Sequence, residues 1–581
     1  MNNGFEIEVM PLSVPSVRRK VEGFLAANGL RLDDVQTYIA VTCDDRIVAG
    51  GGLDGGVIKC VAVSEEARSE GITNTLISRL ISMSDTPAVK VFTKPENEPV
   101  FASLGFRVIA RAEKAVLMEN GIGGLADYVR YLGELRSPGR NGVIVMNANP
   151  FTKGHRYLVE QAAGQVDRLY IIVVKEDRSR FSYAERMAMV EGGTSDLDNV
   201  TVCRGSDYVI SAATFPTYFL KSLDDAAPAH IALDLDLFVR HIAPALGAEI
   251  RFAGSEPTDA LTAQYNAAMA RVLPENGIEF IEIQRLAADA VSCDTKAPEY
   301  AGTPVSASSV RRLLDNGRFH EAAALVPATT VPYLIAALVS RAMGMELDAT
   351  PKPGLVDKSD SGSHGDMNYA LMMRSIKTLR PYFAQFARTF DVDEVRRIGI
   401  EAEQAMLDAT GGVNTHKGAL FCMGLTTSAA GRLYAEEGKI EECSLRRAIM
   451  ELAAGIPESK GTHGAEAKER YGAAGALEMA RMGYPELFDV WLPFIRSHGH
   501  DNESLLRLLL LIMSSLDDTN VLHRAGPAGL ENVKNGSAAL LNDFSNGAME
   551  QMNKDFIKQR ISPGGSADML ALTMFITFIT N

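Results

Sequence analysis

Residues 1 to about 130 mix strand-like and helix-like patterns of apolar positions. In the run TYIAVTCDDRIVAGGGL, two apolar stretches flank Asp44-Asp45, which predicts a β-hairpin. The segment 57–63, VIKCVAV, is a further β-prone run. Apolar positions over 72–81 then recur at helical spacing. We therefore expect an α+β domain over residues 1–130.

Residues 131–335 follow the Pro- and Gly-containing break RSPGRNG and open with a β-loop-α-β unit. The strand VIVM (143–146) leads through the loop NANPFTKGH into the helical stretch RYLVEQAAGQV and the strand LYIIVV (169–174). This order predicts an α/β, parallel, doubly wound sheet. A later strand, IRFAG (250–254), ends in a polar loop.

Long helical patterns rich in Ala, Leu, Met and Gly dominate residues 336–581, and polar loops interrupt them. We expect an all-α domain whose site is built from loops and helix ends. Its boundary with the middle segment lies near 332–350. The most apolar stretches, 505–516 and 569–580, are shorter than the roughly 20 residues of a membrane span, so they predict buried core helices.

Composition narrows the possible functions. A chain of 581 residues exceeds what one hydrophobic core usually serves, so two to four domains are expected. The formal net charge of −15 argues against a nucleic-acid coat or a binder of anionic membranes. The six cysteines form no CxxC pair, which argues against a zinc ribbon and favours reduced thiols in the cytoplasm. The start MNNGFEIEVM lacks the pattern of a signal peptide.

The segment Thr152-Lys153-Gly154-His155 lies between a predicted strand and a predicted helix. Thr152 and His155 share a face of the first helical turn, whose free N–H groups favour an anion. Gly154 lets a ligand approach the backbone, and His155 can hydrogen-bond a phosphate that gains charge during nucleotidyl transfer. Lys153 either adds charge to this site or is a solvated lysine.

A second phosphate-binding pattern opens the helix predicted at SASSVRRLLDNGRF. Serines at a helix start cap it and can bind phosphate oxygens, and Ser308 is one of them. Arg311 adds a charge-assisted fork for a pyrophosphate. Each pattern alone is weak, but the two in this order around a β-loop-α-β unit indicate a nucleotidyl-transfer site.

These two motifs resemble those of the (H/T)xGH nucleotidylyltransferases, and the middle segment is similar to citrate lyase ligase. The matching stretches are NANPFTKGHRYLVE, LDLDLFVRHIAPALG, RFAGSEPTDALTAQYN and VSASSVRRLL. The resemblance implies that ATP and acetate form acetyl-adenylate and pyrophosphate, and that the acetyl group passes to a thiol of the lyase's acyl carrier subunit. It assigns phosphate binding to Thr152, His155, Ser308 and Arg311. Asp234 and Asp236, in a strand-like run, either hold Mg²⁺ or face solvent.

The N-terminal segment resembles GNAT acetyltransferases in two places. Arg68 and Gly71 lie in a turn similar to the acyl-CoA-binding turn of that family, and the stretch 97–106, NEPVFASLGF, is similar to its C-terminal signature. The resemblance implies a GNAT-like fold in which Arg68 and the backbone near Gly71 contact a pyrophosphate. We expect this domain to dock the CoA-like arm; the alternative is a vestigial packing domain.

Five polar loops of the C-terminal half concentrate groups that chelate metals or bind phosphate. TPKPGLVD, GSHGDM, GGVNTHKG, DDTNVLHR and SPGGSAD supply these groups. Asp517, Asn520 and Arg524 are spaced to share one helical face. Carboxylates with His and Asn, without a cysteine cluster, favour Mg²⁺, which usually accompanies substrate phosphates. The alternative for any single residue is capping or turn formation.

These loops closely resemble triphosphoribosyl-dephospho-CoA synthases of the citrate lyase and malonate decarboxylase systems. The resemblance implies that ATP and 3′-dephospho-CoA react with release of adenine, through a sugar cation that a carboxylate stabilises. Metal or general-base roles are expected for Asp366, Asp518 and Asp568. Substrate phosphates are expected to contact Lys352, Asn414, His416, Lys417, Asn520 and Arg524.

Together the resemblances predict a bifunctional, cytoplasmic enzyme that serves citrate lyase through its acyl carrier subunit. ATP, Mg²⁺, acetate and dephospho-CoA are the expected small molecules, with no nucleic acid or membrane partner. Two alternatives remain. One is a generic adenylyltransferase for a pantetheine phosphate, fused to a synthase of the malonate decarboxylase type. The other is a non-catalytic assembly scaffold.

Overall fold

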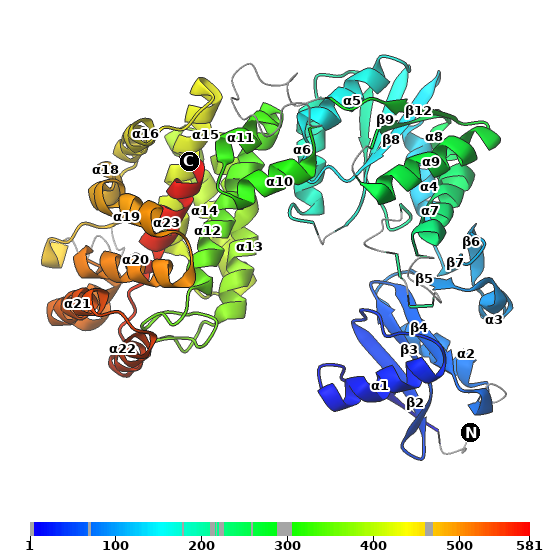
Figure 1. Cartoon of the computed structure of the whole chain (residues 1–581), viewed down its shortest axis with the longest axis horizontal. Coiled ribbons are helices and arrows are strands. Elements are labelled where there is room, and N and C mark those ends of the chain that lie inside the picture. Colours follow the sequence, from blue (N-terminus) through cyan, green and yellow to red (C-terminus); the bar gives the residue numbers. More distant parts are fainter. Residues whose placement is uncertain are drawn as a thin grey trace. The chain divides into compact units, whose positions relative to one another are not determined.

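The computed structural model describes residues 5–67, 71–176, 179–209, 215–216, 218–219, 226–256, 259–286, 305–458 and 469–581 (Figure 1). The chain divides into two compact units. The first comprises Met1–Asn149 and Gly154–Leu286, and the second comprises Pro150–Lys153 and Ala287–Asn581.

The N-terminal part of the first unit is built on a seven-stranded mixed sheet in the order β1-β2-β3-β4-β5-β7-β6. The predicted hairpin is confirmed: β2 and β3 pair antiparallel, and Asp44 and Asp45 turn the chain with φ of 48° and 61°. β4 and β5 pair in parallel, which mixes the sheet. The strands are β1 Glu6–Val9, β2 Thr37–Cys43, β3 Arg46–Asp54, β4 Val57–Val63, β5 Ala88–Thr93, β6 Arg107–Arg111 and β7 Val116–Gly121. The helices are α1 Pro15–Ala27, α2 Ile72–Ser82 and α3 Glu98–Ser103.

The rest of this unit contains a parallel sheet in the order β10-β9-β8-β11-β12, which confirms the doubly wound prediction. The chain starts at the central β8, adds β9 and β10 on one side, and then adds β11 and β12 on the other. The strand order therefore reverses between β8 and β11, and ligands of such sheets bind beyond the strand ends at this point. The strands are β8 Asn141–Met146, β9 Arg168–Val173, β10 Val200–Cys203, β11 Ala248–Gly254 and β12 Glu279–Ile283. The helices are α4 Leu125–Leu135, α5 Lys153–Ala163, α6 Tyr183–Thr194, α7 Ala226–Leu237, α8 Ala243–Leu246 and α9 Ala260–Glu275.

The two sheets of the first unit share one hydrophobic core. The Phe92 and Phe215 rings meet edge to face at 5.6 Å, and the Tyr218 hydroxyl donates to the Phe92 carbonyl at 2.7 Å. Lys90 of β5 pairs with Asp207 at 3.2 Å. The N-terminal α+β part is therefore packed onto the doubly wound part rather than tethered to it.

The second unit is helical over its described residues, as expected. Its last helix, α23, is its most buried element, and it packs against α12, α15, α19 and α20. The predicted core helices at 505–516 and 569–580 are confirmed as α20 and α23. The helices are α10 Ala307–Asp315, α11 Phe319–Ala324, α12 Val331–Asp348, α13 Tyr369–Phe386, α14 Val392–Thr410, α15 Lys417–Glu437, α16 Glu442–Gly455, α18 Ala476–Arg481, α19 Leu492–His498, α20 Asn502–Ser515, α21 Thr519–Asn542, α22 Asn546–Gln559 and α23 Gly564–Ile579.

None of the helices in the described ranges combines the length and apolarity needed to cross a bilayer. Each predicted boundary at 130/131 and 335/336 falls within a continuous helix, α4 and α12 respectively.

Two expectations from spacing are wrong. Asp234 and Asp236 lie on helix α7 and not on a strand, although leucines alternate with them. Asp234 is buried and accepts a hydrogen bond from the Tyr265 hydroxyl, while Asp236 pairs with Arg240 one helical turn away at 2.7 Å. These partners let two carboxylates sit on an otherwise apolar helix, which a two-residue alternation alone could not indicate.

Asp517 does not share a helical face with Asn520 and Arg524. Helix α21 begins at Thr519, Asp518 is its N-cap, and Asp517 precedes the cap. The carboxylate of Asp517 pairs instead with Lys534 at 2.6 Å. The capping requirement of the helix start thus removes Asp517 from the periodic pattern.

Candidate active sites

The loop after β8 is held in place by a buried arginine. Arg186, on α6, is fully buried and donates to the carbonyls of Asn147 and Val174, each at 2.8 Å. These carbonyls follow directly after β8 and β9, so one guanidinium ties the two neighbouring strand ends together. The Asn149 side chain accepts the Phe181 N–H at 3.2 Å. The loop that precedes the predicted TKGH motif is therefore rigid.

His155 lies on the first turn of α5, as the sequence predicts. Burial, together with the positive charge of Arg285, lowers the pKa of His155 to about 4. The imidazole is therefore neutral at pH 7 and can donate through one nitrogen only. Burial also lowers the pKa of Lys153, whose backbone N–H donates to the Leu325 carbonyl at 2.9 Å. Thr152 is fully buried.

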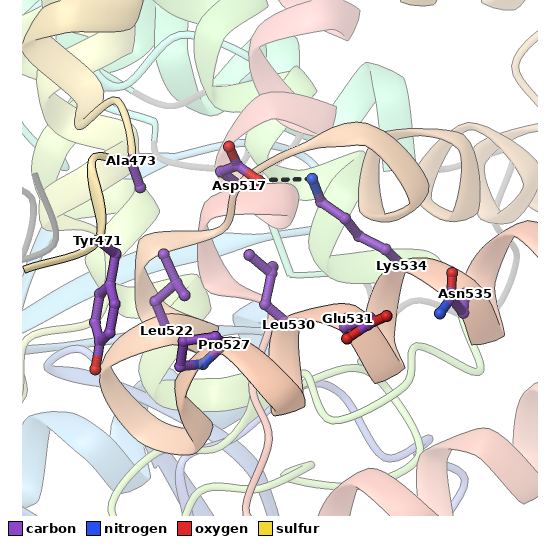
Figure 2. Close-up of a pocket in the computed structure, with 9 residues that line it drawn as sticks. All are labelled: Tyr471, Ala473, Asp517, Leu522, Pro527, Leu530, Glu531, Lys534 and Asn535. Atoms are coloured by element: carbon purple, nitrogen blue, oxygen red, sulfur yellow. Dashed lines mark hydrogen bonds and ion pairs between the residues drawn. The ribbon is translucent and has the colours of Figure 1, made fainter.

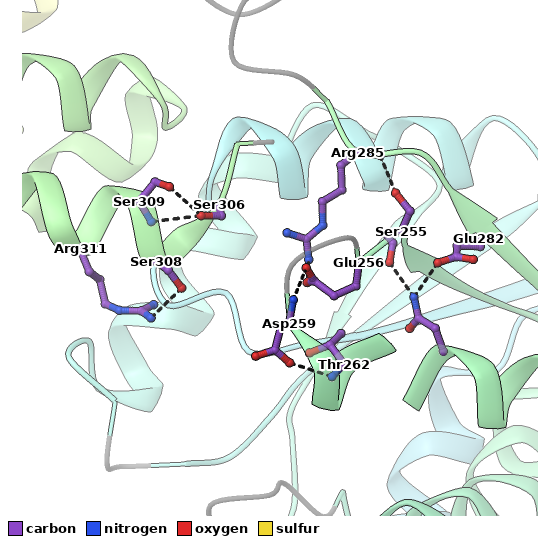
Figure 3. Close-up of polar contacts among 12 residues, drawn as sticks. Ser255, Glu256, Asp259, Thr262, Glu282, Arg285, Ser306, Ser308, Ser309 and Arg311 are labelled. Atoms are coloured by element: carbon purple, nitrogen blue, oxygen red, sulfur yellow. Dashed lines mark hydrogen bonds and ion pairs between the residues drawn. The ribbon is translucent and has the colours of Figure 1, made fainter. Parts of the chain in front are cut away.

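The loops after β11 and β12 are joined by polar contacts (Figure 3). Arg285 pairs with Glu256, and its backbone N–H donates to the Ser255 hydroxyl at 3.1 Å. Glu256 also accepts the Asp259 N–H at 3.0 Å, and Asp259 caps α9 through the Thr262 N–H at 2.7 Å. Both loops lie at the carboxyl ends of their strands, beside the point where the sheet order reverses.

The second predicted phosphate motif starts helix α10 (Figure 3). Ser306 is the N-cap and accepts the Ser309 N–H at 3.1 Å, which confirms the predicted cap. Arg311 donates to the Ser308 hydroxyl at 3.1 Å, so the two side chains expected to bind pyrophosphate lie next to each other. Thr152 and Lys153 belong to the same compact unit as this helix, and His155 belongs to the other unit.

Only half of the predicted acyl-CoA turn can be located. Gly71 has φ of 68° and directly precedes α2, as expected. Arg68 lies outside the described residues.

In the second unit, Asp518 ties two helix starts together. Its Oδ1 accepts the Asn520 N–H at 3.0 Å and the Val521 N–H at 3.4 Å at the start of α21. Its Oδ2 accepts the N–H and the hydroxyl of Ser566, on α23, at 2.8 and 2.9 Å. Burial raises the pKa of Asp518, and these hydrogen bonds act against that rise. The carboxylate is thus fully engaged in structure.

Asp568 lies in a different environment, and its side chain is only partly buried. Its carboxylate rests against the backbone of Gly418, where an added Cβ would overlap it, and it accepts the Ala419 N–H at the start of α15. Burial raises the pKa of Asp568 well above its usual value, and the negative charges of Glu346 and Asp518 raise it further. We call Glu346, Asp518 and Asp568 the carboxylate cluster.

Lys352 is paired inside the protein. It is 1% exposed, its ammonium pairs with Glu346 of α12, and its backbone N–H donates to Asp357 at 2.9 Å. Burial raises the pKa of Glu346, while the Lys352 charge lowers it. The lysine that was expected to contact phosphate therefore also balances the charge of the carboxylate cluster.

His416 lies just before α15 and close to Lys352. Burial lowers the pKa of His416 to about 3, with the Lys352 charge acting in the same direction. Its Nδ1 hydrogen-bonds the Ser375 hydroxyl at 2.8 Å, and its buried Nε2 has no hydrogen-bond partner among the residues that the structure describes. A buried polar nitrogen of this kind costs free energy until a ligand pairs with it.

The remaining predicted residues lie nearer the surface. The exposed Lys417 pairs with Glu403 at 2.6 Å, and the Asn414 side chain accepts the Lys417 N–H at 3.2 Å. Asp366 is exposed and lies 3.9 Å from His364, whose pKa is lowered by burial and by the charge of Arg524. Arg524 is exposed, and the Asn520 amide packs against Gly564.

In the described part of the chain, no group of three or more His, Cys, Asp or Glu side chains is arranged to hold a metal ion, so Asp366, Asp518 and Asp568 do not form one shared metal site there. Sequence reasoning missed two buried charged residues, Arg186 and Glu346, and the partly exposed Arg285. Glu346 had a usable signal, since it is the one acidic residue before Asp348 in the apolar run of α12. The two arginines lie outside any motif.

Comparison with known proteins yields two adjoining matches. A family model described as the citrate lyase ligase C-terminal domain matches residues 141–334. A second model, described as ATP:dephospho-CoA triphosphoribosyl transferase, matches residues 332–581.

Curated relatives follow the same division. The [citrate [pro-3S]-lyase] ligase of Escherichia coli K12 is 42% identical over 326 residues, which are 54% of this chain and 89% of that protein. A probable 2-(5″-triphosphoribosyl)-3′-dephosphocoenzyme-A synthase of Pectobacterium carotovorum is 37% identical over 260 residues, covering 41% of this chain and 86% of that protein. The crystal structure of Thermotoga maritima TmcAL bound with α-thio ATP covers 55% of this chain and 88% of its own, at 12% identity and a TM-score of 0.21.

Proposed function

Because the chain belongs both to the citrate lyase ligase family and to the triphosphoribosyl-dephospho-CoA synthase family, we propose that it is a bifunctional enzyme of citrate lyase maturation. The C-terminal part makes 2′-(5″-triphosphoribosyl)-3′-dephospho-CoA from ATP and 3′-dephospho-CoA and releases adenine. The N-terminal part acetylates the thiol of the finished prosthetic group with ATP and acetate, and releases AMP and pyrophosphate. The observation that carries the proposal is the joining of these two families in one chain, since both reactions serve one prosthetic group.

In the synthase reaction, Asp568 is the general base. It is partly exposed, its pKa is raised, and it accepts the Ala419 N–H. It takes the proton of the dephospho-CoA 2′-hydroxyl as the oxygen bonds to C1″ of the ATP ribose and the bond from C1″ to adenine breaks. The departing adenine receives this proton, so the step balances. Asp518 instead positions α21 and α23, because four donors occupy its oxygens.

Mg²⁺ enters this reaction with ATP as the MgATP complex. Hard cations bound to nucleotides need only one or two protein carboxylates. The exposed Asp366 suits this role better than the fully engaged Asp518, and Asp568 is left to act as the base. Lys417, Asn414, Asn520 and Arg524 remain the proposed phosphate contacts, and the unpartnered Nε2 of His416 binds substrate inside the site.

In the ligase reaction, neutral His155 donates one hydrogen bond to the α-phosphate of ATP, where charge develops as the acetate oxygen attacks. Ser308 and Arg311 bind the pyrophosphate that leaves, and Thr152 and Lys153, in the same motif as His155, also contact the ATP phosphates. The GNAT-like domain, through Gly71 and Arg68, docks the CoA-like arm. The partner is the acyl carrier subunit of citrate lyase.

The enzyme acts in the cytoplasm, where both nucleotide substrates occur. The described cysteines agree with this location, since Cys43, Cys60, Cys203, Cys422 and Cys443 are all free thiols. The ligase relatives favour citrate lyase over the malonate decarboxylase system, and two intact enzyme families in one chain disfavour a non-catalytic scaffold.

Chromatography of adenine-containing products tests the proposal. Purified protein is incubated with MgATP, in one reaction with dephospho-CoA and in another with acetate and deacetylated citrate lyase. Free adenine is expected only in the first reaction and AMP only in the second. Adenine without AMP would refute the ligase assignment, and AMP without adenine would refute the synthase assignment.

A further inference from the structure

A cavity of about 320 Å³ lies beside helix α21 in the second unit (Figure 2). We propose that it binds the adenine ring of one of the two synthase substrates, ATP or dephospho-CoA; this inference rests on the proposed synthase activity. The volume is at the lower end of the roughly 300–1,000 Å³ typical of ligand pockets, which suits a nucleoside better than a whole coenzyme.

One part of the cavity wall is apolar and suits a flat ring. Leu522 and Leu530 contribute buried side chains, and Pro527 lies between them along the chain. The helix is kinked here, because Gly526 has φ of 68° and ψ of −172°, a conformation that interrupts regular helix. Tyr471 lies at the opposite end of the row from Lys534 (Figure 2), and its 39% exposure leaves the ring accessible for stacking.

The charges around the cavity select a neutral ligand. Lys534 is the one cation among the described lining residues, and Asp517 already pairs with it at 2.6 Å. Glu531 adds a second carboxylate, so the lining carries a net charge of −1, which disfavours a phosphate group. Adenine is neutral, its exocyclic amine can donate to Glu531, and the Asn535 amide can both donate to and accept from its ring edge.

The position of the cavity also fits adenine. Asp517 lines it and directly precedes Asp518, a member of the carboxylate cluster in electrostatic contact with Asp568. In both substrates the adenine is close to the reacting atoms. In ATP it is the leaving group at C1″, and in dephospho-CoA it is attached to the carbon next to the one that bears the attacking hydroxyl. The pantetheine arm lies beyond a diphosphate, which the acidic lining disfavours.

Steady-state kinetics of adenine release with the full chain test this inference. Tyr471→Ala removes the stacking surface, so we expect a roughly five- to hundredfold rise in KM for one substrate, with AMP formation by the ligase unchanged. A higher KM for ATP identifies the adenine of ATP as the occupant of the cavity. A higher KM for dephospho-CoA identifies the adenine of dephospho-CoA instead. Tyr471→Phe should retain wild-type values because it keeps the ring. Met482→Ala, at an exposed apolar side chain outside the cavity, is the matched control.

Unchanged KM values for both substrates in folded Tyr471→Ala would overturn the inference. A binding measurement separates this failure from a failure of the proposed function. Saturation-transfer NMR of adenosine with the full chain should show ring contacts that weaken at least fivefold in Tyr471→Ala and persist in Tyr471→Phe. Absence of adenine release by the wild type, with this Tyr471-dependent binding intact, would refute the synthase assignment and retain the adenine pocket. Adenosine binding that ignores Tyr471 would refute the pocket.

Discussion

At the scale of single residues, hydrogen bonding and exposure distinguish the carboxylate that we propose as the base from the one that caps a helix. Asp518 is buried and accepts four hydrogen bonds from two helix starts, whereas Asp568 is partly exposed and its pKa is raised by desolvation and by two carboxylate neighbours. Replacing Asp568 should therefore lower activity, whereas replacing Asp518 should mainly lower stability. Replacing the neutral His155 should also lower activity, in the ligase reaction.

His155→Ala should lower AMP and pyrophosphate release by about 10²- to 10³-fold, because it removes a hydrogen bond that strengthens as the phosphate gains charge. Adenine release should stay at the wild-type rate. Product chromatography checks both. His498→Ala, at a surface histidine of the other unit, should change neither activity. Loss of both activities in folded His155→Ala protein would contradict two separate sites.

Asp568→Asn should reduce adenine release by about 10²- to 10⁴-fold and leave AMP formation intact. A base with a raised pKa ionises only at higher pH, so kcat/KM for adenine release should rise with pH through a midpoint above the usual carboxyl range.

The raised pKa of Asp568 also affects the stability of the protein. The folded state holds this proton more tightly than the unfolded state, so its contribution is complete below the unfolded pKa and is lost as pH rises to the folded one. Calorimetry should therefore show the variant gaining stability relative to wild type as pH rises. A pH-independent difference would argue against the raised pKa.

Asp518→Ala should act mainly on stability, by about 2 kcal/mol or more, because it removes a helix cap and leaves the buried Ser566 N–H without its acceptor. Urea unfolding measures this change. Asp391→Ala, which removes the exposed cap of α14, should cost less. Equal losses would show that the tether to α23 contributes nothing.

At the scale of elements, the start of helix α15 determines where Asp568, the proposed base, lies. Gly418 lets the backbone approach the Asp568 carboxylate so closely that no side chain fits between them. The first turn of α15 also supplies the Ala419 N–H, and helix starts stabilise nearby negative charge. The helix thus positions the carboxylate through its backbone, and the side-chain identity at position 418 is part of the site.

Gly418→Ala should therefore displace Asp568 and lower adenine release at least tenfold, with AMP formation unchanged. Gly344→Ala is the matched control, because Gly344 lies inside α12 with open space around it. That change should stabilise the protein by about 0.5–1 kcal/mol and preserve both activities. Retained adenine release in Gly418→Ala would contradict the placement of Asp568.

At the scale of the whole molecule, the two families to which the chain belongs match separate, consecutive parts of its sequence. The single tryptophan, Trp491, is buried in the second unit, so its fluorescence follows the unfolding of that unit alone. Tyrosine side chains occur in both units and report on both. One protein therefore offers separate readouts of its two halves.

Dephospho-CoA at 100 times its Kd should stabilise the second unit by about 2.7 kcal/mol and raise the midpoint of the tryptophan transition. The unfolding of the first unit, which circular dichroism detects and tryptophan fluorescence does not, should keep its midpoint temperature. Thermal unfolding with both probes makes the measurement, with adenine-free pantetheine as the control ligand. A rise in the midpoint seen by circular dichroism but not by tryptophan fluorescence would place dephospho-CoA binding in the first unit.

The sequence by itself determined the local order of this protein: the hairpin at Asp44-Asp45, the β-loop-α-β unit, the buried helices α20 and α23, and the motif positions of His155 and Asp568. Those features depend on residues close together in the chain, on the spacing of apolar positions and on helix capping, so they can be predicted from the sequence alone. The alternation of leucine and aspartate at Asp234 and Asp236 wrongly predicted a strand. It gives no information on Tyr265 and Arg240, the partners that let these carboxylates lie on a helix.

Only the tertiary structure decided how charges are shared inside the sites. Lys352 pairs with Glu346, Arg186 joins two strand ends, Asp518 links α21 to α23, and Asp568 rests against Gly418. Each of these contacts forms only when the chain is folded, and the surroundings of a charged group set both its pKa and its available partners. Residue type and spacing can nominate a carboxylate, but the surrounding protein determines whether it caps a helix or takes a proton.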